Sequence, residues 1–177
     1  FTGSTEVGKA IMRQVAGSGK RLTLELGGKA ANIVFEDAPL DQAIEGVVNG
    51  IFFNQGHVCC AGSRLLLQES IALGTLRFGD PLDKNTDIGA INSAAQLARI
   101  DELVSSGEDE GADRWSAPCT LPERGWWFAP TVFTDCRDDM RIVREEIFGP
   151  VLSMLVFDDE AEAVQRANAS RFGLAAG

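Results

Sequence analysis

Residues 52–64 have the sequence FFNQGHVCCAGSR, in which two adjacent cysteines, Cys59 and Cys60, lie between stretches rich in small and polar residues. This composition is typical of a loop that leaves a helix. A thiolate becomes a strong nucleophile when positive charge, a helix N-terminus or backbone N–H groups stabilise it and a substrate can approach closely. The glycines on both sides of the pair allow such an approach, so the loop is a candidate for covalent catalysis.

The cysteine pair also has a purely structural interpretation, because free cysteines are usually small buried hydrophobic residues. Adjacent cysteines suit neither a shared disulfide nor a tetrahedral metal site, in which ligand pairs are about two to four residues apart. The pattern therefore predicts no metal site. Chemistry alone does not rank Cys59 above Cys60.

The composition excludes several classes of function. The 177 residues are 45% hydrophobic and 24% charged, as in an ordinary globular domain. The formal net charge of −10 argues against a nucleic-acid partner, whose phosphates it would repel. No apolar run reaches the roughly 18 to 20 residues that span a bilayer, so we expect no membrane segment. The four cysteines are too sparse for a disulfide framework, which favours a cytoplasmic location.

The spacing of apolar residues predicts an alternation of helices and strands. Between residues 40 and 53, apolar residues recur at helical spacing and lead the chain into the cysteine loop. We expect helices near residues 4–17, 40–53, 93–106 and 159–169. We expect strands over residues 21–26, 31–35, 64–68, 126–128, 131–133 and 151–157, and an acidic surface turn over 108–111.

Two further stretches contain candidate site residues. Glu25 lies at the end of the predicted strand 21–26, which Gly27 and Gly28 break, so its carboxylate has room to move, as a general base requires. The alternative is a solvated surface glutamate. Residues 1–8, FTGSTEVG, contain a glycine turn that opens a helix, and such a helix start offers free N–H groups to a phosphate. An ordinary capped helix has the same pattern.

Four motifs occur in order along the chain: FTGSTEVG (1–8), LELGGK (24–29), FFNQGHVCCAGSR (52–64) and REEIFGPVL (144–152). Together they resemble the motifs of the aldehyde dehydrogenase superfamily. Glu25 and Cys59 are 59 − 25 = 34 residues apart, as the family requires of its glutamate and cysteine. Because the chain begins inside the first motif, without a methionine, we expect it to be an internal piece of a longer protein.

The resemblance implies an α/β, aldehyde-dehydrogenase-like fold. Residues 1–27 would form the C-terminal part of a Rossmann-like dinucleotide-binding domain, and residues 28–177 a truncated α/β catalytic domain with the thiol nucleophile. One irregularity lies near Ile71 and Ala72, where the family has a helix between a strand and the segment that follows. Here the two segments nearly abut, which indicates either a deletion of a packing element or residues absent from the sequence.

The implied activity is NAD(P)-dependent oxidation of an aldehyde to a carboxylic acid. Cys59 occupies the family's nucleophile position, three residues after Gly56, and would form a thiohemiacetal and then a thioester. Glu25 would activate the water that hydrolyses the thioester. The parent protein is expected to be a homo-oligomer, while the aldehyde and the choice between NAD and NADP stay open. The alternative is a catalytically incompetent fragment, or a nucleotide-binding or structural remnant of such an enzyme.

The resemblance also assigns cofactor-binding residues in the first two motifs. Ser4 would contact a phosphate of the dinucleotide, and Thr2 would lie near the nicotinamide, with Gly3 in the same turn. The backbone carbonyl of Leu26 would accept a hydrogen bond from the nicotinamide amide.

The last motif supplies two more cofactor contacts. Glu146 would hold the nicotinamide ribose, and Phe148 would border the ring. His57 lies where relatives often have glutamine, and we expect it to position the backbone. Residues 126–128, Trp-Trp-Phe, are candidates for lining an aldehyde pocket, although core packing is the favoured interpretation.

Overall fold

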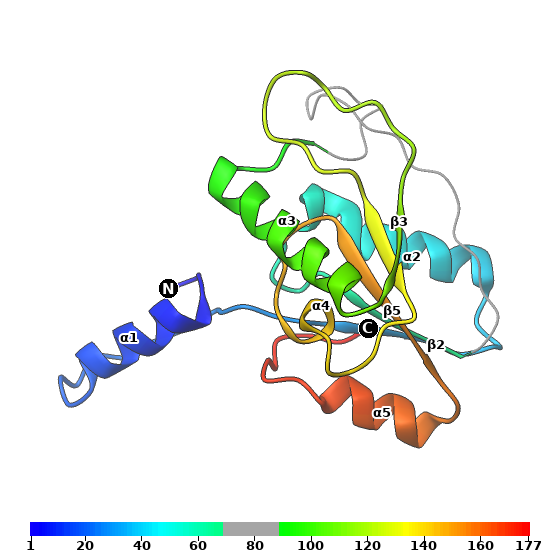
Figure 1. Cartoon of the computed structure of the whole chain (residues 1–177). Helices are drawn as coiled ribbons and strands as arrows, with labels where there is room; N and C mark the ends of the chain where they lie inside the picture. The colour runs from blue at the N-terminus through cyan, green and yellow to red at the C-terminus, as the bar shows by residue number, and fades with distance from the viewer. Residues whose placement is uncertain (69–88) are drawn as a thin grey trace.

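A five-stranded sheet forms the centre of the protein, for which a computed structural model describes residues 1–68 and 89–177. The strands are Ala31–Val34 (β1), Arg64–Gln68 (β2), Asp113–Ser116 (β3), Thr131–Thr134 (β4) and Val151–Phe157 (β5). Their order in the sheet is β1-β2-β5-β4-β3. Figure 1 labels β2, β5 and β3. Strands β1, β2, β5 and β4 run parallel to one another, whereas β3 pairs antiparallel with β4 at one edge.

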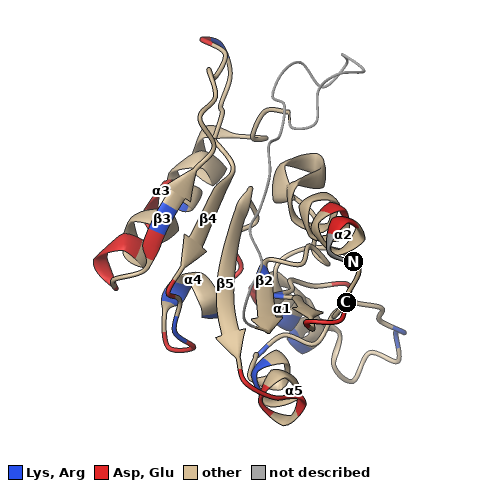
Figure 2. Ribbon diagram, turned by 90° about the vertical axis from the view of Figure 1, so that its right-hand side faces the viewer, with Lys and Arg blue, Asp and Glu red and all other residues tan. Residues whose placement is uncertain are grey.

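Helices cover both faces of this sheet. The described residues form helices at Thr5–Val15 (α1), Leu40–Phe52 (α2), Ala94–Asp109 (α3), Arg141–Arg144 (α4) and Glu160–Asn168 (α5), with a 3-10 turn at Phe53–Gly56 (η1). Helix α2 lies on one side of the sheet, and α3 and α4 lie on the other (Figure 2). None of the described helices is long and apolar enough to cross a membrane.

The side-chain alternation of β5 explains the two layers. Val151 and Leu155 belong to the apolar cluster formed with α3, α4 and α5, and Leu152 and Met154 belong to the cluster formed with α2. A parallel strand that is covered on both faces needs a nearly continuous apolar run. The sequence VLSMLVF of β5 meets this requirement, and its only buried polar residue, Ser153, donates a hydrogen bond to the Ile142 carbonyl at 3.1 Å.

Helix α1 projects away from this layered body at the end of an extended segment (Figure 1). The residues that precede this helix are tied to the segment before β1 by two backbone hydrogen bonds. The Gly3 N–H donates to the Glu25 carbonyl at 3.0 Å, and the Glu25 N–H donates to the Phe1 carbonyl at 2.9 Å. The division of the chain into two domains at residue 27 stays a prediction.

The sequence predicted most of these elements. The predicted strands at 64–68 and 151–157 have the observed bounds, and those at 31–35 and 131–133 differ by one residue. The four predicted helices are present as α1, α2, α3 and α5. The α/β fold class is therefore confirmed. The predicted irregularity near residues 71 and 72 lies outside the described residues.

Two predicted strands are wrong. Residues 21–26 contain only a single bridge, to the N-terminal segment, and do not join the sheet. Residues 126–128 form no strand either: Phe128 is buried in the core, whereas Trp126 is 45% exposed and its carbonyl accepts a hydrogen bond from Ile91 N–H. Apolar or alternating residues indicate an extended segment, but a strand also needs a neighbouring strand within reach.

The sequence analysis missed β3 and α4. Strand β3, DRWS, has no fully buried side chain, so no apolar period marks it. Helix α4 has four residues, too few to show a helical period. Helix α3 continues to Asp109, so the predicted acidic turn at 108–111 is wrong in its first two residues.

Candidate active site

The cysteine loop begins where α2 ends, and its backbone turns sharply before the thiols. Three consecutive residues adopt the left-handed conformation, Asn54, Gln55 and Gly56, with φ of 50°, 57° and 70°. The His57 N–H donates a hydrogen bond to the Asn54 carbonyl at 2.9 Å, and the Asn54 side chain donates to the His57 carbonyl at 3.2 Å. These contacts close the turn two residues before Cys59.

Two glycines of the LELGGK motif let this loop and Glu146 approach the same point. If Gly28 carried a Cβ atom, that atom would lie 2.2 Å from the carbonyl oxygen of Cys59. On Gly27, a Cβ atom would lie 2.1 Å from Oε2 of Glu146. The Gly28 N–H donates a hydrogen bond to Oε1 of Glu146 at 3.1 Å. Close packing against the Cys59 backbone therefore favours glycine at position 28, whereas the Glu146 side chain beside Gly27 can shift.

These segments enclose a cavity of about 340 Å³. Its lining residues are Thr2, Gly3, Ser4, Leu26, Gly27, Cys59, Gln96, Arg99, Glu146, Ile147 and Phe148. Seven of the eight predicted site residues are among them, although they come from segments far apart in the sequence. The eighth predicted site residue, Glu25, is not among the lining residues that the structure describes.

The four cysteines differ in their surroundings. Cys59 is half-buried and lines the cavity, whereas Cys60 is exposed and is not among the lining residues. Burial raises the pKa of the Cys136 thiol to about 11, and it also raises the pKa of Cys119. These two thiols are therefore weaker nucleophiles near neutral pH.

Glu25 lies next to the cavity with its side chain exposed to solvent. Its backbone is held by the hydrogen bonds to Phe1 and Gly3, and the two residues that follow it, Leu26 and Gly27, line the cavity. The backbone of Glu25 is thus held next to two lining residues, while its side chain is exposed to solvent.

The N-terminus of α1 also reaches the cavity through Ser4. The Ser4 hydroxyl accepts a hydrogen bond from the Val7 N–H at 3.3 Å and so caps the helix. The positive end of the helix dipole accordingly lies at the cavity wall. This position suits an anion, while the role of Ser4 as a phosphate contact stays a prediction.

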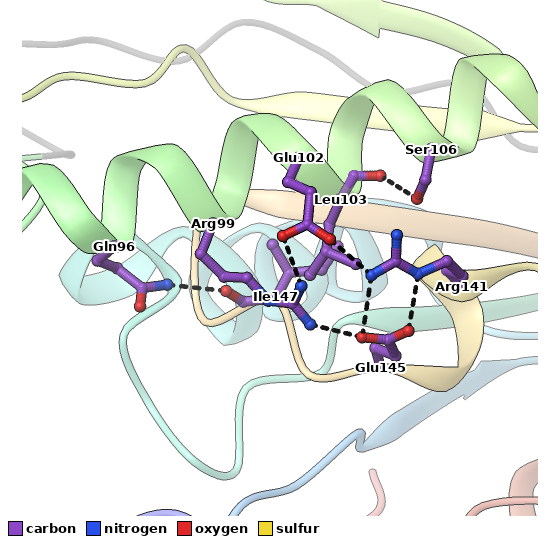
Figure 3. A network of polar contacts seen from close by, with 8 residues as sticks. All are labelled: Gln96, Arg99, Glu102, Leu103, Ser106, Arg141, Glu145 and Ile147. Atoms are coloured by element: carbon purple, nitrogen blue, oxygen red, sulfur yellow. Dashed lines mark hydrogen bonds and ion pairs between the residues drawn. The ribbon is translucent and has the colours of Figure 1, made fainter.

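Two adjacent glutamates, Glu145 and Glu146, face different environments. Glu145 forms ion pairs with Arg99 of α3 and Arg141 of α4, and Arg141 also pairs with Glu102 (Figure 3). The hydrogen bond from Arg141 is the main reason why the pKa of Glu145 is lowered. Glu146 has no such pair among the described residues, and burial raises its pKa despite the opposing hydrogen bond from the Gly28 N–H.

Gln96 was missed by the sequence analysis. It lies in the first turn of α3, and its side-chain amide donates hydrogen bonds to the carbonyls of Ile147 and Phe148, each at 2.9 Å. Figure 3 shows the Gln96 amide pointing towards Ile147. A polar residue on an amphipathic helix looks like any solvated residue, so no sequence signal distinguished it.

Lys29 is a second unexpected residue. Its side chain is 2% exposed, and Nζ has no hydrogen-bond partner in the part of the chain that the structure describes. Burial, together with the nearby Arg64 guanidinium, lowers the pKa of Lys29 to about 7. The sequence placed Lys29 in a motif but gave no sign of this environment.

Comparisons with known proteins identify the family of the chain. The sequence profile described as the aldehyde dehydrogenase family matches residues 1–177. The chain belongs to this family. DhaS of Bacillus subtilis (strain 168) is 46% identical to it over 187 residues, which cover 100% of this chain and 38% of DhaS.

Solved aldehyde dehydrogenases have the same fold over this region. An NAD-dependent aldehyde dehydrogenase from Sinorhizobium meliloti is 44% identical with a TM-score of 0.92, and the match covers 99% of this chain and 37% of that one. A betaine aldehyde dehydrogenase from Staphylococcus aureus, solved in complex with NAD+, is 39% identical with a TM-score of 0.93, over 99% of this chain and 38% of that one. The chain thus spans less than two fifths of the length of these aldehyde dehydrogenases.

Proposed function

We propose that the protein oxidises an aldehyde to a carboxylic acid with NAD or NADP, through a covalent intermediate on Cys59. The observation that carries this proposal is the shared cavity, in which Cys59 lies with the predicted cofactor residues. The family membership supports the reaction class. The NAD-dependent Sinorhizobium enzyme and the NAD+ complex of the Staphylococcus enzyme support the cofactor class.

The cavity residues fit the nicotinamide half of such a cofactor. Ser4 at the start of α1 offers a phosphate the positive end of a helix, and the Glu146 carboxylate can accept hydrogen bonds from ribose hydroxyls. The Phe148 ring supplies an apolar wall, and Leu26 a backbone carbonyl. A nicotinamide ring bound there would supply the acceptor for a hydride from the substrate carbon.

Cys59 performs the first step in this proposal. Its thiolate sulfur attacks the carbonyl carbon of the aldehyde, a C–S bond forms, and the carbonyl electron pair moves to oxygen to give the thiohemiacetal oxyanion. The Cys59 backbone N–H is available to donate to this oxygen, and the loss of one such donor typically costs about 3 to 4 kcal/mol. Oxidation of the thiohemiacetal leaves a thioester on Cys59.

Glu25 performs the second step. Its carboxylate takes a proton from water, the water oxygen attacks the acyl carbon, and the C–S bond breaks to release the carboxylic acid and the Cys59 thiolate. The exposed position of Glu25 at the cavity edge, followed by Gly27, suits a base that moves towards the thioester after the cofactor withdraws. A base of this kind favours hydrolysis over acyl transfer to coenzyme A.

A second candidate function is a nucleotide-binding or structural role without turnover. The observation that favours it is the length of the chain, which spans 38% of DhaS. Mass spectrometry of the purified protein and its ability to reduce NAD distinguish the two candidates. A chain of 177 residues that binds nucleotide but does not oxidise any aldehyde of a panel supports the second candidate.

The central experiment compares Cys59→Ser with Cys60→Ser. We expect Cys59→Ser to abolish the aldehyde-dependent rise in reduced-nicotinamide absorbance and Cys60→Ser to retain most of it, because only Cys59 lines the cavity among the two. Equal losses in both variants contradict the assignment. Glu25→Gln is expected to arrest the reaction at the thioester, visible as an added acyl mass on Cys59, and undiminished turnover of this variant contradicts the role of Glu25.

A further inference from the structure

His57 and Phe148 form a flat stack between two loops that are 91 residues apart in the sequence. The ring centroids are 5.2 Å apart, and the ring planes differ by 5°. His57 belongs to the cysteine loop, two residues before Cys59. Phe148 belongs to the segment after α4 and lines the cavity that Cys59 also lines. The stack therefore joins the cysteine loop to a second segment of the cavity wall.

Phe148 needs support from its surroundings because its backbone is strained. Its φ of 55° lies in the left-handed region, which a bulky residue rarely adopts. Such conformations are unfavourable and persist only where neighbouring contacts fix them. Gln96 fixes the backbone with its two hydrogen bonds to the carbonyls of Ile147 and Phe148. These bonds act on the backbone and not on the ring, against which His57 stacks.

The two loops are also in direct backbone contact beside the stack. If Gly56 carried a Cβ atom, that atom would lie 2.2 Å from the Gly149 carbonyl oxygen. The residue before His57 is thus pressed against the residue after Phe148. Because the loops meet at both points, a shift of one ring is transmitted to the other loop.

The chemistry of His57 suits packing better than hydrogen bonding. Its Nε2 atom is buried, and the described residues provide no hydrogen-bond partner for it. Burial lowers the pKa of His57, so the neutral imidazole is favoured near neutral pH. A neutral ring without a polar partner contributes mainly through its flat face.

We propose that His57 is a positioning residue that fixes the Phe148 ring against the cavity and thereby the place of the nicotinamide beside Cys59. This inference rests on the proposed function, in which Phe148 borders the nicotinamide. It adds a side-chain role to the sequence-based expectation that His57 positions the backbone.

The test compares His57→Ala, His57→Gln and His57→Phe in the protein that contains this chain. Hydrogen–deuterium exchange of peptides covering residues 146–150 reports the order of the Phe148 loop without any ligand. Titration with NADH and with ADP-ribose reports the nicotinamide contact, because ADP-ribose lacks only the nicotinamide ring. His57→Phe is the rescue variant, since it keeps a flat ring and removes the imidazole nitrogens.

We expect His57→Ala and His57→Gln to accelerate exchange in residues 146–150. We also expect them to weaken NADH binding by about three- to tenfold, the range typical of an aromatic pair, and to leave ADP-ribose binding unchanged. We expect His57→Phe to restore both properties. Unchanged exchange in His57→Ala overturns the inference, and so does equal weakening of NADH and ADP-ribose. A third outcome is that exchange accelerates in His57→Ala while the wild-type protein binds NADH and ADP-ribose equally well. That result refutes the nicotinamide site of the proposed function, and with it the role of His57 in placing that ring.

Discussion

The carbonyl oxygen of Cys59 lies 2.2 Å from the point that a Cβ atom on Gly28 would occupy. The predicted nucleophile therefore rests directly on the backbone of the LELGGK motif. The same Gly28 donates its N–H to Glu146, a predicted cofactor contact. One residue without a side chain thus sets the spacing between the thiol loop and the cofactor wall.

Gly28→Ala should destabilise the protein and disturb the thiol. The added methyl group cannot share space with the Cys59 carbonyl, so the loop must shift, at a cost of about 1 to 3 kcal/mol. Gly46→Ala is the matched control, because Gly46 lies inside α2 with open space around its Cα. That change should stabilise the protein by about 0.5 to 1 kcal/mol. Urea unfolding and the alkylation rate of Cys59 by iodoacetamide measure both effects, and an unaltered Gly28→Ala protein would refute the contact.

Glu146→Gln and Glu145→Gln separate a cofactor contact from a structural ion pair. Glu146→Gln keeps an acceptor for the Gly28 N–H but removes the negative charge, so NADH should bind about tenfold or more weakly if the carboxylate holds the ribose. Glu145→Gln breaks the pairs with Arg99 and Arg141, which are partly exposed, and should cost about 0.5 to 1 kcal/mol of stability. Isothermal titration and urea unfolding distinguish them. Equal losses of NADH affinity contradict the division of roles.

Lys29 should make stability increase with pH between 7 and 9. The folded protein releases the Lys29 proton near pH 7, whereas the unfolded chain keeps it up to about 10.5. In this interval the unfolded chain binds more protons, so the free energy of unfolding rises with pH, by at most about 1.4 kcal/mol per pH unit. Above pH 9 the opposite effect sets in, because the Cys136 thiol has a pKa of about 11 when folded and 9.0 otherwise.

Lys29→Met should remove this pH dependence while it keeps the buried volume. Urea unfolding at pH 7, 8 and 9 provides the measurement. Lys9→Met, a change of an exposed lysine on α1, is the control and should keep the slope of the wild type. If Lys29→Met keeps the same slope, Lys29 is charged in the folded protein.

The features that could be predicted from the sequence were short local motifs and buried apolar runs. Strands β2 and β5 are covered by helices on both faces, so their apolar runs marked them without reference to any partner. The motif residues Cys59, Leu26 and Glu146 were found as short patterns, and the cavity brings them together. Their chemical roles stay predictions.

Contacts between distant segments could not be predicted from the sequence. The hydrogen bonds from Gln96 to the Phe148 loop span about 50 positions, and nothing in the pattern of α3 indicates them. The burial of Lys29 depends on three-dimensional packing around β1 and β2, although lysine is usually exposed. The predicted strand at 21–26 failed for the same reason, since strand formation depends on which segment lies beside it.

Arg64 should be one of the residues on which the layered body around the sheet depends most for stability. Its side chain is buried, with Nε donating to the Lys29 carbonyl and the two terminal nitrogens donating to the carbonyls of Arg166 and Ala167, each at 2.9 Å. The planar guanidinium thus satisfies the last turn of α5, and a lysine cannot reach three acceptors in this geometry. Arg64→Lys should therefore cost about 2 to 4 kcal/mol in urea unfolding and accelerate hydrogen exchange in α5. Arg114→Lys on the edge strand β3 is the control, because it changes an exposed arginine and should cost less than about 1 kcal/mol. Similar losses of unfolding free energy in the two variants would show that the Arg64 contacts do not stabilise the end of α5.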